Sequence, residues 1–119
     1  PGVNFVICHL LAPNGKQEEE LKRALEGLAL PNVWFDLASV PHNCMDASEP
    51  WKRAGAYVRL ARDLVGADKL LFGTDMPSAL KEAPYGDYVR WIREMEGLND
   101  AEREQILYQN AAKVYAGLS

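Results

Sequence analysis

Three short apolar segments, each followed by a stretch with helical periodicity, constrain the fold of this chain more than any other feature of its sequence. They are VNFVICH at residues 3–9, VWFDLAS at residues 33–39 and KLLFGT at residues 69–74. Nearly continuous apolar runs of this length are typical of strands that are buried on both faces of a parallel sheet. Their starts lie about 30 and 36 residues apart, which is the length of a strand–helix–strand unit. The pattern predicts an α/β fold built on a parallel sheet.

The segments between and after these runs predict helices, because their apolar residues recur every three or four positions. Gly66 suits the end of the second helix. Asn99 or Asp100 can cap the first turn of the fourth helix. Asn110 stands where a cap for the last helix would stand. The predicted helices span residues 16–28, 51–65, 85–96, 98–107 and 111–118.

Two architectures fit this order of strands and helices. One is an open, doubly wound sheet, and the other is a segment of an eight-stranded (β/α)8 barrel. Neither GxGxxG nor GxxxxGK[ST] follows any of the three predicted strands, so the usual phosphate-binding signatures of the open sheet are missing. Residues 1–119 contain no low-complexity segment and no clear linker, and we expect them to belong to one domain.

The composition argues against several classes of protein. Charged residues make up 25% of the chain, the net charge is -4, and no cluster of Lys and Arg interleaves with aromatic residues, so we expect no nucleic-acid partner. No apolar run approaches the roughly 20 residues of a membrane span, so we expect no membrane partner either. Cys8 and Cys44 lack the spacing of metal ligands. We interpret them as free thiols in a reducing compartment, the cytoplasm.

Polar side chains near the carboxyl ends of the predicted strands are the candidates for chemistry, because active sites of parallel α/β folds gather there. His9 ends the first predicted strand, and Asp75 directly follows the third. If these strands flank the second one, their backbones lie about 10 Å apart, which is two strand spacings. Imidazole nitrogen and carboxylate oxygen are standard zinc ligands, and bound zinc can make a nucleophile of water at neutral pH. The spacing permits His9 and Asp75 to meet at one metal ion or across one water, without requiring it.

Each candidate also has a structural interpretation. His9 can be a hydrogen-bonded residue at the end of an apolar strand, and Asp75 can cap the turn that follows it. Asp36 lies inside the second predicted strand, where we interpret it as a buried, hydrogen-bonded acid. We interpret His42 as an ordinary loop histidine, with a lid or substrate contact as the alternative.

Four segments together resemble the C-terminal part of the amidohydrolase-related family. In chain order they are FVICHLL, NVWFDLAS, GADKLLFGTDMP and LNDAEREQILYQNAAKVYAGL. The last two are the most specific, and the four together span nearly the whole chain. The resemblance is to the branch of the amidohydrolase superfamily that includes aminocarboxymuconate-semialdehyde decarboxylase.

The resemblance implies a fold, a metal and a set of roles. The fold is a (β/α)8 TIM barrel, of which this chain supplies parallel strands six to eight, their helices and the C-terminal helices. Asp75 is then the strand-eight aspartate that binds a catalytic divalent metal, zinc or else manganese, or acts on its water. His9 is the strand-six histidine beside the metal, as an acid/base or as a ligand, and Asn110 is the helix-capping asparagine of the tail. The implied activity is metal-dependent hydrolysis or non-oxidative decarboxylation of a small carboxylated or aromatic substrate.

The chain departs from the family pattern at two places. Leu10 and Leu11 follow His9, where family members often have glycines, and this changes the loop above the site. The family's His-x-His pair on strand one and its strand-five histidine have no counterpart here. Two protein ligands are then present where a catalytic zinc normally has three.

These departures bear on whether the chain acts alone. Three strands cannot close a barrel of about 250 residues, and an open sheet would leave edge strands without partners. We therefore expect an incomplete C-terminal piece, inactive alone, that joins a missing N-terminal barrel half or associates with copies of itself. The alternative is a non-catalytic half-barrel, a structural or interaction module derived from the same family.

Overall fold

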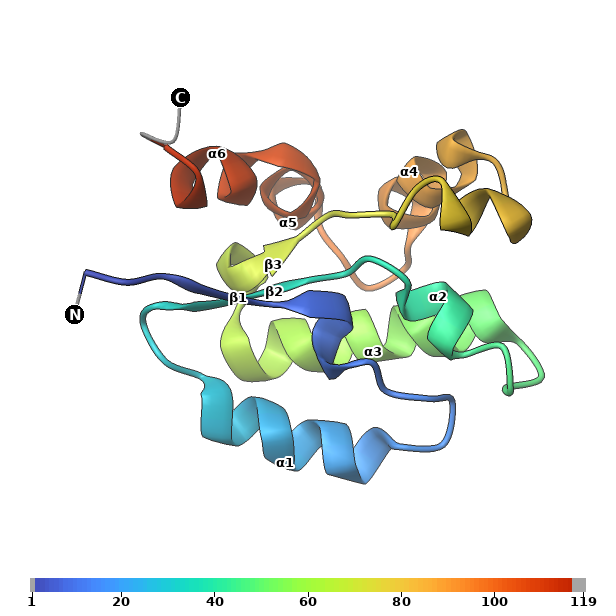
Figure 1. Ribbon diagram of the computed structural model, residues 1–119, viewed down its shortest axis with the longest axis horizontal. Helices are drawn as coiled ribbons and strands as arrows, with labels where there is room; N and C mark the ends of the chain where they lie inside the picture. Colours follow the sequence, from blue (N-terminus) through green and yellow to red (C-terminus); the bar gives the residue numbers. More distant parts are fainter. Residues whose placement is uncertain (1, 117–119) are drawn as a thin grey trace.

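Three short parallel strands lie at the centre of the computed structural model, which describes residues 2–116. They are β1 (Phe5–Ile7), β2 (Val33–Asp36) and β3 (Leu70–Leu71), with β2 in the middle. Figure 1 shows the sheet between two layers of helices. The predicted α/β fold with three parallel strands is confirmed. That these are strands six to eight of a barrel stays a prediction.

Two long helices, α1 (Glu18–Leu28) and α3 (Pro50–Val65), cover one face of the sheet (Figure 1). Alternate residues of a strand point to the same face, and Val33 and Phe35 of β2 are buried while the residues between and after them are half-buried. Phe35 is flanked in register by Ile7 and Leu70. The helices add small and branched apolar residues to this core: Leu21, Leu25, Ala54, Val58 and Ala61.

A second helical layer lies on the other side of the sheet (Figure 1). It contains α4 (Tyr85–Glu94), α5 (Asp100–Glu104), a π-helical segment η4 (Gln105–Gln109) and α6 (Asn110–Val114). Shorter elements stand between a strand and the neighbouring helix along the chain: η1 (Cys8–Leu11), α2 (Val40–Asn43), η2 (Ala67–Lys69) and η3 (Ser78–Lys81). Within residues 2–116, no helix is long and apolar enough to cross a bilayer.

The predicted helix ends are partly confirmed. Gly66, with a φ of 95°, follows the last residue of α3. Asn99 caps α5: its side chain accepts from the N–H of Glu102, and the Glu102 side chain accepts from the N–H of Asn99. The prediction of two separate C-terminal helices is wrong, because α5, η4 and α6 follow one another without a break.

The prediction that Asn110 caps a helix is also wrong. Asn110 has helical dihedral angles inside the continuous C-terminal run, so no free helix start exists there to be capped. Its side chain is 1% exposed, and its Nδ2 donates to the carbonyl oxygens of Ala67 at 2.7 Å and Leu70 at 2.8 Å. The residue therefore joins the C-terminal helix to β3.

The outer edge of β3, away from β2, is covered by this helix. The Phe72 N–H donates to the carbonyl oxygen of Ile106, which lies in the π-helical segment, at 2.9 Å. This bond replaces strand pairing, and β3 ends at Leu71 rather than at residue 74. The expectation of open edges is wrong for β3. At the opposite edge, β1 pairs only with β2 among residues 2–116, and Val3 and Phe5 are exposed.

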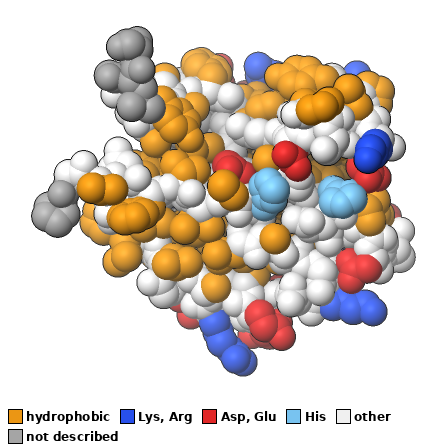
Figure 2. Space-filling model, viewed as in Figure 1, with side chains coloured by type: hydrophobic (Ala, Val, Ile, Leu, Met, Phe, Trp, Pro, Cys, Tyr) orange, Lys and Arg blue, Asp and Glu red, His pale blue; other side chains and the backbone are white. Residues whose placement is uncertain are grey.

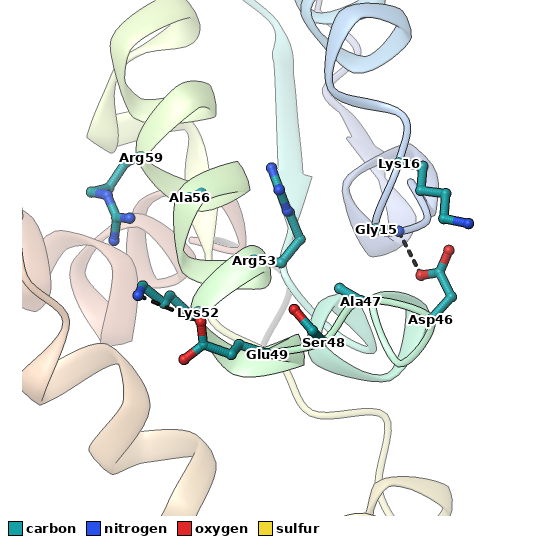
Figure 3. Close-up of a pocket in the computed structure, with 10 residues that line it drawn as sticks. All are labelled: Gly15, Lys16, Asp46, Ala47, Ser48, Glu49, Lys52, Arg53, Ala56 and Arg59. Atoms are coloured by element: carbon teal, nitrogen blue, oxygen red, sulfur yellow. Dashed lines mark hydrogen bonds and ion pairs between the residues drawn. The ribbon is translucent and has the colours of Figure 1, made fainter.

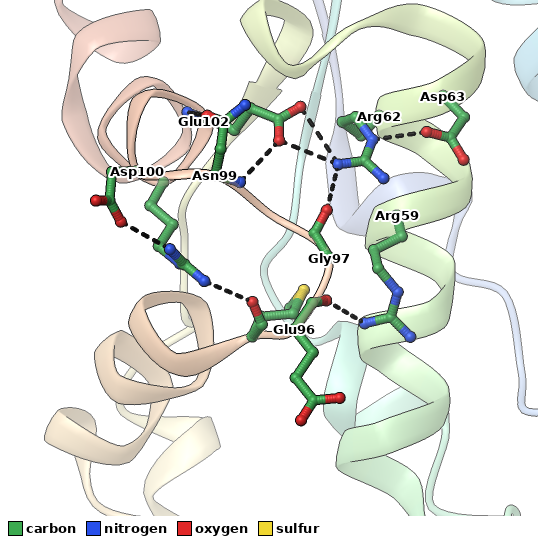
Figure 4. Close-up of polar contacts among 10 residues, drawn as sticks. Arg59, Arg62, Asp63, Glu96, Gly97, Asn99, Asp100 and Glu102 are labelled. Atoms are coloured by element: carbon green, nitrogen blue, oxygen red, sulfur yellow. Dashed lines mark hydrogen bonds and ion pairs between the residues drawn. The ribbon is translucent and has the colours of Figure 1, made fainter.

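Two arginines of α3 hold the segment that leads into α5 (Figure 4). Arg62 Nη1 donates to the Gly97 carbonyl at 2.6 Å and to the Glu102 carboxylate at 3.1 Å. Arg59 Nη1 donates to the Glu96 carbonyl at 3.1 Å. Because Glu102 also caps α5, one carboxylate joins the cap to α3.

Candidate functional site

A non-glycine residue with left-handed backbone stands just beyond the carboxyl end of each strand. His9 follows β1 with a φ of 56°, Ser39 follows β2 with 61°, and Asp75 follows β3 with 63°. The run after β1 continues in this conformation through Ala12. Such residues cost of order 1–3 kcal/mol each and cluster at functional sites, where the surrounding structure enforces them. The three chain reversals therefore mark this end of the sheet as the candidate site.

Asp36 fixes the backbone at two of these reversals. Its Oδ1 accepts from the N–H of His9 at 2.8 Å and from the N–H of Ala38 at 3.2 Å. The interpretation of Asp36 as a hydrogen-bonded acid is confirmed, although the side chain is half-buried rather than buried. Its negative charge raises the pKa of the neighbouring Cys8 thiol. Asp36 thus sets the position of the His9 backbone through Oδ1.

Asp75 is held by a residue that the sequence did not single out. The Ser39 hydroxyl donates to Asp75 Oδ2 at 2.8 Å across 36 residues of chain. The Asp75 carboxylate is therefore engaged across two loops instead of capping the turn after it. Oδ1 accepts no hydrogen bond from any residue in the described part of the chain, and Asp75 is exposed. The sequence did hold one signal that could have pointed to Ser39, because this polar residue ends the second predicted strand.

His42 and Glu82 form a second link between the same two loops. The His42 Nδ1 lies 2.8 Å from Glu82 Oε1, with 58% of the His42 side chain exposed. Since a carboxylate only accepts, the ring proton is assigned to Nδ1. The interpretation of His42 as a loop histidine is wrong, because the residue lies in α2. The alternative, a lid or substrate contact, stays a prediction, and no pattern in the sequence pointed to Glu82.

A pocket of about 290 Å³ lies between the two loops. Ser39 and His42 line it from the loop after β2. Asp75 lines it from the loop after β3, together with Ser78, Ala79, Lys81 and Glu82. The pocket therefore combines carboxylate, hydroxyl, imidazole and ammonium groups at the carboxyl ends of the strands, where ligands of parallel α/β folds bind.

The structure places His9 and Asp75 at the same end of the sheet, on the two strands that flank β2. Figure 2 shows histidine side chains on one face, with acidic side chains near them. Across residues 2–116, however, no three His, Cys, Asp or Glu side chains come together closely enough to hold a metal ion. The described residues bring together Asp75 and Ser39, and His9 and Asp36, but no complete ligand set.

The donor atoms nevertheless suit one part of a metal site. Asp75 offers an oxygen that no described residue occupies, next to a pocket, and His9 carries an imidazole at the reversal after β1, on the far side of β2. Nitrogen and oxygen donors suit zinc or manganese. These two residues fit a divalent metal as contributors to a larger ligand set.

A larger pocket of about 450 Å³ lies along the first part of α3 and is also lined by residues that precede α1 and α3 (Figure 3). Several of its charged groups have partners: Asp46 accepts from the Gly15 N–H at 2.8 Å, and Lys52 pairs with Glu49 at 3.6 Å. Arg53, also on its wall, pairs with Glu18 at 3.1 Å. Nothing predicted from the sequence falls in this pocket.

Comparison with known proteins decides the family. The amidohydrolase family model matches residues 1–117. The chain belongs to the amidohydrolase family. The narrower resemblance to the aminocarboxymuconate-semialdehyde decarboxylase branch stays a prediction.

Individual relatives agree with this assignment. An L-fucono-1,5-lactonase of Burkholderia ambifaria is 31% identical over 100 residues, which cover 77% of this chain and 32% of the lactonase. A crystal structure of an amidohydrolase from Burkholderia multivorans with bound zinc has a TM-score of 0.83 at 24% identity, covering 96% of this chain and 44% of that chain. A 5-carboxyvanillate decarboxylase from Sphingomonas paucimobilis has a TM-score of 0.63 at 14% identity, covering 94% and 33%. This chain thus spans about a third of the length of the lactonase and less than half of the length of each of these two solved chains.

Proposed function

We propose that this chain is part of a metal-dependent hydrolase or non-oxidative decarboxylase that acts on a small carboxylated or aromatic molecule. The family and the lactonase relative support hydrolysis, and the decarboxylase among the structural neighbours keeps decarboxylation open. The observation that carries the proposal is the Asp75 carboxylate, which is held at one oxygen and free at the other beside a pocket at the strand ends.

In this proposal Asp75 and His9 serve a divalent metal, zinc or else manganese. A zinc-bound neighbour of the same fold supports the choice of zinc. Such an ion supplies Lewis acidity and a nucleophilic water at neutral pH. Asp75 would help to hold the ion or would accept a proton through Oδ1, and His9 would add a nitrogen ligand or move a proton to or from the reacting group. Asp36 keeps His9 in place through its backbone N–H.

The remaining ligands would come from outside this chain. The chain's share of its relatives, 32% of the lactonase and 44% of the zinc-bound amidohydrolase, supports a longer barrel whose N-terminal half is missing here. The unpaired side of β1, with Val3 and Phe5 exposed, is where that half or a second copy would join.

The test compares Asp75→Asn with Asp68→Asn in the complete protein, because Asp68 is an exposed aspartate in η2, at the other end of the strand. Asp75→Asn should lower turnover at least about 100-fold and reduce the metal content measured by mass spectrometry. Loss of a residue that only hydrogen-bonds to a metal ligand already lowers metal affinity or activity about 10–100-fold. Asp68→Asn should behave like the natural protein. Unchanged turnover and unchanged metal content in Asp75→Asn would refute the proposal.

A further inference from the structure

We propose that Ser39 is a positioning residue for Asp75, whose hydroxyl holds Oδ2 and thereby presents Oδ1 to the metal or to the metal's water. This inference rests on the proposed function of Asp75 and extends it to a residue outside the predicted site. Three independent features of Ser39 support it: the use of its hydroxyl, its backbone conformation and its burial.

The hydroxyl is used in an unusual way for its place in the chain. Ser39 directly precedes α2, where a serine side chain usually caps the first turn and contributes about 1 kcal/mol. Here it makes no capping hydrogen bond. It donates instead to Asp75 Oδ2 at 2.8 Å. Instead of a local capping bond, the hydroxyl makes a hydrogen bond that joins the loop after β2 to the loop after β3.

Both partners of this hydrogen bond have the same unfavourable backbone. Ser39 has φ 61° and Asp75 has φ 63°, and each stands just beyond the end of a neighbouring strand. Left-handed backbone at a non-glycine residue persists when the surrounding structure enforces it. At Ser39 this conformation turns the chain between β2 and α2, and the side chain it carries meets the Asp75 carboxylate.

Burial differs between the two partners of this hydrogen bond. Ser39 is 9% exposed, whereas Asp75 is exposed. The hydrogen bond therefore lies on the protein side of the carboxylate, where little water competes for it. A carboxylate tied at one oxygen loses rotational freedom, so the free oxygen is presented in one orientation. Groups that orient metal ligands in this way contribute 10–100-fold to metal affinity or activity.

The test is Ser39→Gly in the complete protein. Glycine adopts a φ near 61° without strain. This variant therefore removes the hydroxyl and adds no backbone strain. The dissociation constant for zinc, measured by competition with a chelator, should rise about 10–100-fold, with the melting temperature of the metal-free protein unchanged or higher. Ser39→Ala should weaken zinc binding equally but lower the melting temperature, because it loses the same hydrogen bond and, unlike glycine, keeps the strain of a side chain at this φ. Ser48→Gly, which removes an exposed hydroxyl elsewhere, should leave zinc binding unchanged.

Parallel measurements on Asp75→Asn separate this inference from the proposed function. If Asp75→Asn loses zinc while Ser39→Gly binds it within about twofold of the natural protein, the positioning role of Ser39 is overturned and the proposed function stands. If Asp75→Asn binds zinc normally, both fail. A fall in kcat with little change in KM for Ser39→Gly would support orientation of the reacting group over substrate binding.

Discussion

The outer edge of β3 and the carboxyl ends of the strands are held by contacts of different kinds. At the edge, a fully buried amide of Asn110 donates twice to backbone carbonyls, and the π-helical segment accepts from Phe72. At the strand ends, single side-chain hydrogen bonds join two loops, and their partners Asp75 and His42 are exposed. The difference indicates that the C-terminal helix anchors β3 at its outer edge. The residues that follow β3 then need few further contacts to hold their positions.

The largest effect on stability is expected at Asn110. Asn110→Ala would leave the carbonyls of Ala67 and Leu70 without their side-chain donor in the interior, and we expect a loss of about 2–6 kcal/mol, at roughly 1–3 kcal/mol for each of these two groups. Urea denaturation of the natural and variant proteins gives this difference. Lys113→Ala, an exposed change on the same helix, should cost less than about 0.5 kcal/mol. If Asn110→Ala and Lys113→Ala were equally stable, the Asn110 hydrogen bonds would not anchor β3, and this prediction would be wrong.

A smaller effect is expected where α3 holds the segment before α5. Arg62 has 21% of its side chain exposed and bonds both Gly97 and Glu102, so Arg62→Ala should cost about 1–2 kcal/mol. Arg90→Ala is the matched control, because Arg90 is 60% exposed and, among the residues that the structure describes, pairs with Asp87 alone. The control should change the free energy of unfolding by less than about 0.5 kcal/mol. A larger loss in Arg90→Ala than in Arg62→Ala would contradict the difference in burial on which this expectation depends.

The smallest effect on stability is expected at the strand ends. A double-mutant cycle of His42→Ala and Glu82→Gln should give a coupling energy of about 0–1 kcal/mol, the range for exposed pairs. Coupling above about 2 kcal/mol would mean that the rim of the pocket contributes to the fold as much as the buried edge does, and the contrast between the two regions would fail.

The strands, the long helices and the candidate aspartate could be predicted from local patterns. The apolar runs located the strands, Leu21 and Leu25 recur at helical spacing, and Gly66 ends α3 as predicted. Burial on both faces was not confirmed, because Val33 and Phe35 alternate with half-buried residues. Asp75 follows an apolar run, so its place at a strand end was also visible. Periodicity encodes which face of an element is buried, and this information is local.

The partners of these elements were decided by the tertiary structure. Asn110 looked like a helix cap, because the sequence gives no sign that η4 continues the helix through residue 110. Ser39 and Glu82 reach Asp75 and His42 across 36 and 40 residues of chain. Hydrogen bonds between such distant residues depend on which loops the sheet order brings together, and no short-range spacing records that order. The amino-acid sequence by itself thus determined the strands, the helices that cover them and the acid at the end of β3. The tertiary structure decided what holds that acid and which oxygen remains free.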